Sequence, residues 1–224
     1  MNQNPQVVVR RPAESVLATN KVLRNTYLLL SMTLIFSAIM SGVAVAINAS
    51  YMSALVCDII GIALLWFVMP RYRNSFAALP LTFLFVGLWG YGLGPVIGHY
   101  LAFANGAELV MTALGGTAII FLGLSGYVLT SRKDFTFLGG YLFVGLLVAL
   151  AAILLNLFLG IPALYLAINS VVIMLMSGFI LYDTSRIIHN GETNYVMATI
   201  ALYLDIIILF QHLLSLLSFF AGDD

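Results

Sequence analysis

The sequence predicts an all-α integral membrane protein with seven transmembrane helices. Apolar residues make up 62% of the 224-residue chain and charged residues only 8%, whereas a soluble domain carries about 25% charged residues. The mean hydropathy is +1.07. Apolar stretches of about 20 residues recur along the chain, each long enough to cross the ~30 Å hydrocarbon core of a lipid bilayer. The composition therefore excludes a soluble domain. The zero net charge, without a basic block, argues against nucleic acid as a partner.

Prolines and short polar clusters separate the predicted spans. The first apolar run exceeds the 7–15 residues of a cleavable signal core, so we expect it to be retained as the first span. The spans are expected at residues 26–48, 52–70, 77–99, 107–130, 138–159, 162–182 and 194–219. Short connections predict one helical bundle over residues 26–220, between a polar N-terminal tail (1–25) and a short C-terminal tail (221–224).

All nine lysines and arginines fall on one side of a bundle with seven spans. They lie in the N-terminal tail and after the second, fourth and sixth spans, while the opposite loops carry none. The positive-inside rule then predicts a cytoplasmic N-terminus and a C-terminus outside. A re-entrant last segment would instead return the C-terminus to the cytoplasm. The polar residues Asp205, Gln211 and His212 in that segment keep this alternative open.

Two aspartates, Asp183 and Asp205, stand in the last two apolar stretches, on either side of the polar hairpin 184–194. A charge near the bilayer centre costs about 2.5–3.5 kcal/mol on insertion scales, so acids kept there usually serve a proton, an ion or a buried partner. If the two carboxyl groups meet, they share one proton and sense pH as a coupled pair. They would hold calcium only weakly and transiently, because calcium takes six to eight oxygen ligands. The spacing leaves their contact open.

Other residues are auxiliary candidates for this site. Tyr182 and Tyr203 neighbour the two acids, and in a purely structural interpretation they donate hydrogen bonds to the carboxylates and hold the helices together. Glu192 and His189 belong to the polar hairpin. Asp58, in the second span, is either a water-facing acid near an external vestibule or a hydrogen-bonding residue in helix packing. We favour the packing role for Asp58.

Signals of an enzyme are weak. The three histidines, His99, His189 and His212, form no His-x-x-x-His or Glu-x-x-His pair of the kind that binds zinc on a helix. The glycine-rich run 87–95 lies inside a span without a following Lys-Ser/Thr, so it predicts close helix packing or a kink rather than phosphate binding. We therefore expect a non-enzymatic protein with no catalytic residue and no cofactor apart from transient calcium.

Several stretches of the chain resemble the Bax inhibitor-1 family of small membrane proteins. The matching residues are 181–184, 189–195 and 201–205, and they include both aspartates. Further stretches resemble the bacterial YccA-like branch in particular, at residues 21–27, 92–95, 113–118 and 131–134.

The resemblance implies a fold in which a last, semi-polar helix is surrounded by the other six. It also implies a bacterial inner-membrane protein that associates with the membrane-anchored ATP-dependent protease FtsH and restrains it. The polar tail 1–25 would then be a flexible cytoplasmic handle for the protease. The alternative is a pH-sensitive calcium leak channel gated by Asp183 and Asp205. Some such channels pair these acids with a basic residue in the second span, but this sequence has no Lys or Arg between Thr26 and Met69.

Overall fold

The computed structural model describes residues 14–189 and 191–222, with side chains from Lys21 onward. Helices account for all the regular structure in these residues. They are α1 (Glu14–Ala46), α2 (Tyr51–Ala63), α3 (Met69–Tyr72), α4 (Ala78–Leu101), α5 (Gly106–Ser131), α6 (Gly139–Leu159), α7 (Pro162–Ile188) and α8 (Tyr195–Ala221). Seven helical segments are long and apolar enough to cross a membrane, which confirms the predicted fold class.

The second span is made of three consecutive pieces. A π-helical turn, Leu64–Val68, joins α2 to α3, and the N–H of Met69 closes this turn by donating to the carbonyl oxygen of Leu64. Pro70 follows at the start of α3. Proline has no N–H to donate and its ring clashes with the carbonyl four residues earlier, so a wider turn before it relieves both problems. The span therefore continues past Pro70 as far as Tyr72.

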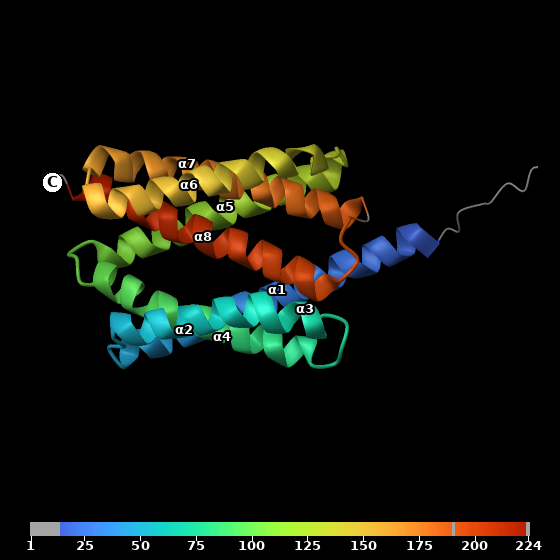
Figure 1. Cartoon of the computed structure of the whole chain (residues 1–224), viewed down its shortest axis with the longest axis horizontal. Coiled ribbons are helices and arrows are strands. Elements are labelled where there is room, and N and C mark those ends of the chain that lie inside the picture. The colour runs from blue at the N-terminus through green and yellow to red at the C-terminus, as the bar shows by residue number, and fades with distance from the viewer. Residues whose placement is uncertain (1–13, 190, 223–224) are drawn as a thin grey trace, which may run out of the picture.

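Helix α8 lies at the centre of the bundle. In Figure 1 it crosses between one group formed by α5, α6 and α7 and another formed by α1, α2, α3 and α4. Within its most apolar window 56% of the residues are buried, compared with 11% for the span that contains α6. Four of the other six spanning helices contact α8 among the described residues, namely α1, α4, α5 and α7, while α2 packs on α4 and α6 packs on α7. Helix α8 therefore lies among the other six spans, four of which contact it directly.

Helices α1 and α4 approach each other closely along the predicted glycine-rich run. A Cβ added to Gly90 would overlap the backbone of Ser37, and one added to Gly94 would overlap Ala44. Pro95 lies inside α4, which nevertheless continues to Leu101. The run therefore lets two helix backbones pack together, as the sequence predicted.

Two helix ends differ from the sequence prediction. Helix α1 begins at Glu14, inside the segment predicted as a polar tail, and residues 1–13 lie outside the described residues. Helix α7 continues to Ile188 instead of ending at Tyr182. Polar residues had marked its predicted end, but Thr184 and Ser185 are fully buried and hydrogen-bonded to Ser125 and to the Phe135 N–H respectively. Paired polar side chains let the helix continue.

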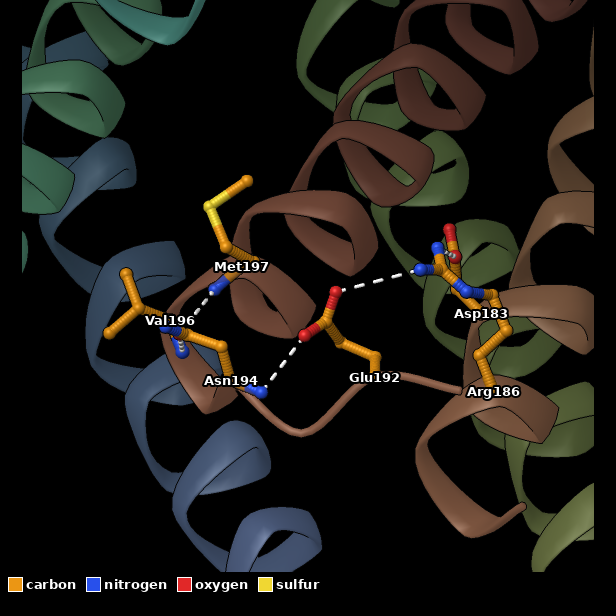
Figure 2. Close-up of polar contacts among 6 residues, drawn as sticks. All are labelled: Asp183, Arg186, Glu192, Asn194, Val196 and Met197. Atoms are coloured by element: carbon orange, nitrogen blue, oxygen red, sulfur yellow. Dashed lines mark hydrogen bonds and ion pairs between the residues drawn. The ribbon is translucent and has the colours of Figure 1, made fainter. Parts of the chain in front are cut away.

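Asn194 fixes the start of α8 and ties it to the loop between α3 and α4. Its Oδ1 accepts from the N–H groups of Val196 (2.9 Å) and Met197 (3.2 Å), which makes it the N-cap residue (Figure 2). Its Nδ2 donates to the carbonyl oxygen of Arg73 (2.7 Å) and to Oδ1 of Asn74 (2.9 Å). One side chain thus satisfies two backbone donors at the helix start and holds a second loop in place.

We expect Asn194→Ala to lower the free energy of unfolding by about 2 kcal/mol, because both the cap and the loop contacts are lost. Ser50 is a matched control, since it caps α2 by accepting from Ser53 N–H, and its side chain makes no hydrogen bond to another helix or loop among the described residues. Ser50→Ala should lower it by about 1 kcal/mol or less. Unfolding in detergent, followed by circular dichroism, measures both. Equal losses would show that the contacts with Arg73 and Asn74 add no stability.

Candidate functional site

The two aspartates of the candidate site meet where α7 and α8 pack together. Asp183 stands in the last turns of α7 and is 9% exposed, while Asp205 lies in the middle of α8 and is 5% exposed. Their carboxyl groups are close neighbours in this contact. The spacing had left this contact open, and the structure brings the two acids together.

The contact determines what the pair can do chemically. No N–H or hydroxyl donor among the described residues reaches the buried Oδ2 of Asp205. Two like charges held this close in an apolar interior repel each other, and a proton shared by the two carboxyl groups would remove that repulsion.

Arg186 supplies a positive charge on the side of this pair that faces the α7–α8 loop. Its Nη1 lies 3.4 Å from Oδ1 of Asp183, and its Nη2 lies 3.5 Å from Oε2 of Glu192 in the following loop. Figure 2 shows the guanidinium group between the two carboxylates. The same group lies over the ring of Tyr182, 5.4 Å from the ring centre. Sequence reasoning missed this role, although the three-residue spacing of Asp183 and Arg186 on a helix was the signal that could have found it.

The two tyrosines do not bond the acids. The hydroxyl of Tyr203 donates to the carbonyl oxygen of Val86 (3.3 Å) and shares a hydrogen bond with Ser37 (2.8 Å), on the side of α8 that faces α1 and α4. Tyr182 packs instead against Gly139 and Arg186. The expectation that either tyrosine donates to a carboxylate is wrong. Asp183 and Asp205 lie in the contact between α7 and α8, whereas the side chain of Tyr203 points toward α1 and α4.

The remaining candidates occupy separate places. Asp58 is half-buried on α2 and lies against Gly92 of α4, and α2 contacts neither α7 nor α8 among the described residues. His189 is exposed and its Nδ1 lies 3.0 Å from the carbonyl oxygen of Ser185. Glu192 pairs with Arg186 and accepts from the N–H of Asn194 (2.9 Å). Of the auxiliary candidates, Glu192 and Tyr182 reach the acid pair, both through Arg186.

A second polar contact holds the α5–α6 loop to the end of α7. Asp134 accepts from the hydroxyl (2.7 Å) and the N–H (2.8 Å) of Thr136, and its contact with the Ser185 hydroxyl is longer, at 3.4 Å. The Thr136 hydrogen bonds are the main cause that lowers the pKa of the Asp134 carboxyl. The N–H of Phe135 also donates to Ser185 (2.9 Å). Sequence reasoning missed this contact because its partners are about fifty residues apart.

No group of three His, Cys, Asp or Glu side chains gathers within residues 14–189 and 191–222 to hold a metal ion. Asp183 and Asp205 alone supply four carboxylate oxygens, which is fewer ligands than calcium prefers. Calcium binding at this pair therefore stays a proposal.

The sequence profile of a family described as "Inhibitor of apoptosis-promoting Bax1" matches residues 19–222, nearly the whole chain. The chain belongs to the Bax inhibitor-1 family. The match covers all seven spans and includes both members of the acid pair.

Bacterial members of the Bax inhibitor-1 family are similar to the chain over almost their full length. A Vibrio cholerae protein named "Uncharacterized membrane protein" is 49% identical over 94% of this chain and 95% of its own. The Escherichia coli protein "Modulator of FtsH protease YccA" is 46% identical over 93% of this chain and 94% of its own. A second E. coli sequence with the same identity is named "Inner membrane protein YccA". With its seven apolar spans, the chain is a multi-pass inner-membrane protein.

The resemblance to the Bax inhibitor-1 family implies, for some channels, a basic residue in the second span that pairs with the two acids. This chain has no Lys or Arg between Thr26 and Met69, a range that includes most of the second span. In this structure the basic group beside Asp183 is Arg186, which comes from α7 itself. The charge pair is therefore local to the α7–α8 hairpin. No residue of the second span is needed to form this ion pair.

Proposed function

We propose that this protein modulates a membrane-anchored ATP-dependent protease of the FtsH type, as an inhibitor that acts by binding. The observation that carries this proposal is the 46% identity to E. coli YccA, which extends over 93% of the chain. The similarity extends over nearly the whole length of both chains, which supports a shared way of binding a partner. A binding role needs no catalytic group, and we propose that the protein is not an enzyme.

The proposal is tested by degradation assays with E. coli FtsH reconstituted in proteoliposomes. We expect the protein, added at increasing ratios, to slow proteolysis of a labelled membrane-protein substrate several-fold. Digestion of the protein itself, followed in the same samples, separates a poorly digested competitor from an inhibitor that is left intact. An unchanged rate of proteolysis at a tenfold molar excess of folded protein would reject the modulator function.

We further propose that the N-terminus is cytoplasmic and offers the protease its point of attack. Removal of residues 2–20 ends just before the first span, which begins at Lys21. The shortened protein should insert normally but should no longer be degraded by FtsH, because an ATP-dependent protease needs an accessible chain end to start on. Pulse–chase turnover in cells measures this. If the shortened protein is degraded as fast as the full chain, the N-terminal segment is not the place where the protease starts.

A pH-sensitive ion leak is the second candidate function. The observation that favours it is the contact of Asp183 with Asp205 inside the membrane, next to the cation of Arg186. Ionisable groups at this depth usually lie on the path of a proton or an ion. Loss of the shared proton would leave two like charges in contact, and the separation of α7 from α8 would relieve their repulsion. We propose calcium as the ion, held transiently, with protons as the controlling ligand.

A further inference from the structure

A groove runs along the bundle between α1 and α5. The side chain of Tyr27 on α1 meets Ser125 and Phe121 on α5, but the backbones of the two helices do not pack closely on each other among the described residues, although both pack on α8. The α8 residues Ile206, Ile207 and Phe210 therefore form the floor of an opening of about 630 Å³. This volume lies within the roughly 300–1,000 Å³ that is typical of binding sites for small ligands.

The groove is long and narrow and lies at membrane depth. On α1 its wall extends from Ser31 to Val45, which is about 21 Å at the ~1.5 Å rise per residue of a helix. One leaflet of a ~30 Å hydrocarbon core is only about 15 Å deep. The wall starts at the α1 end that lies opposite the basic loops, and it therefore reaches past the bilayer midplane.

The lining excludes water and charged ligands. No charged residue contributes to it, and its polar groups are confined to a few serine and threonine hydroxyls. The hydroxyl of Ser37, one of these, is already hydrogen-bonded to Tyr203. A buried water needs two to four polar partners, which an apolar groove does not offer.

The groove opens directly onto the lipid-facing surface. Its α5 rim carries Leu114 and Leu122, which are 48% and 66% exposed. On α1 the exposed side chain of Ile35 lies beside the wall residues Leu34 and Ala38. The hydrocarbon that covers these exposed residues is thus continuous with the inside of the groove.

We propose that this groove is a binding site for one acyl chain of a bilayer phospholipid. Spread over 21 Å, 630 Å³ corresponds to a mean cross-section of about 30 Å². A single hydrocarbon chain fits a narrow, water-free groove of this kind, and the hydrocarbon of the bilayer already covers its exposed rim. The bound chain packs against Ile206 and Ile207, directly after Asp205 in α8. This site does not depend on the proposed protease or leak function.

Two glycines allow a matched test. A Cβ at Gly42, which lines the groove, would have no neighbour within 4 Å, and the same holds for Gly126 of α5, which does not line it. We expect Gly42→Leu to place its side chain in the groove, since there is open space around the new Cβ, whereas Gly126→Leu adds the same side chain elsewhere. Native mass spectrometry of protein washed in mild detergent should find one retained phospholipid in the wild type and in Gly126→Leu. Retention should fall at least fivefold in Gly42→Leu. Equal retention in all three proteins would overturn the proposal.

Cross-linking identifies the occupant. A photoreactive maleimide on Ala38→Cys, in a Cys57→Ser background, should yield an adduct with the mass of a phospholipid in the washed protein. The same probe on Ile35→Cys, outside the groove, should yield none, because loosely held lipid has been removed. A cross-link from position 38 to another protein in native membranes would overturn the acyl-chain assignment and make the groove a docking site for a partner helix.

Discussion

Asp205→Asn is expected to remove the pH dependence of calcium flux through the protein. If one proton joins Asp183 and Asp205 in the wild type, as we propose, its release places two like charges in contact inside the bundle. An asparagine amide donates to Asp183 at every pH, so it mimics the protonated pair permanently. Flux into proteoliposomes loaded with a calcium-sensitive dye, measured from pH 6 to pH 8, should vary about fivefold or more in the wild type, as expected for a coupled equilibrium. In the variant it should stay flat.

Asp58→Asn is the matched control for this experiment. It removes an acid from another span that contacts neither α7 nor α8 among the described residues, and it should leave the pH profile unchanged. Asp183→Asn should flatten the profile as Asp205→Asn does. Identical profiles in the wild type and in Asp205→Asn would reject the acid pair as a gate. Absence of flux above that of empty liposomes, from folded protein, would reject the leak and leave the protease proposal standing.

Gly90→Ala is expected to lower the free energy of unfolding by about 2–3 kcal/mol, because the new methyl group overpacks the α1–α4 contact. The added Cβ would overlap the carbonyl oxygen and Cα of Ser37, which are backbone atoms and cannot swing aside. Any shift of Ser37 also disturbs its hydrogen bond to Tyr203, and so reaches the central helix.

Gly98→Ala, two turns further along α4, provides the opposite case. A Cβ at Gly98 meets no atom within 4 Å, so this substitution should stabilise the helix by about 0.5–1 kcal/mol through the loss of glycine's flexibility. Thermal unfolding in detergent, followed by circular dichroism, should therefore show shifts of opposite sign on one helix. Shifts of the same sign would mean that close packing of α1 on α4 does not limit stability.

The features that sequence reasoning predicted correctly depend on local composition. Apolar runs of bilayer length determine the spans, and the glycines between residues 87 and 94 indicated where two helices approach closely. Where polar residues interrupted a run, the prediction was less accurate. Thr184 and Ser185 seemed to end a helix that continues, because their partners lie on α5 and in the α5–α6 loop.

The candidate site was predictable in its two acids but not in its surroundings. Asp183 and Asp205 stand out because carboxyl groups are rare in apolar segments. Their contact depends on how α7 and α8 pack, which spacing alone leaves undetermined. The direction of Tyr203 depends on the rotation of α8 against α1 and α4. Arg186 was assigned only to a cytoplasmic loop by the orientation rule, and the continuation of α7 through residue 186 is what places it beside Asp183.

The central position of α8 sets an order for biogenesis. It is the last of the seven spans to leave the ribosome, yet α1, α4, α5 and α7 all pack on it. Helix α1 likewise packs on α4 rather than on α2, so the first span meets this neighbour only after the third span has emerged. Six helices are therefore already in the bilayer before α8 inserts, and the faces that will pack on α8 still lack this partner. One of these faces, on α7, carries Asp183. The bundle closes only when α8 inserts, and a chain interrupted before Tyr195 would present these faces to the quality-control machinery of the membrane.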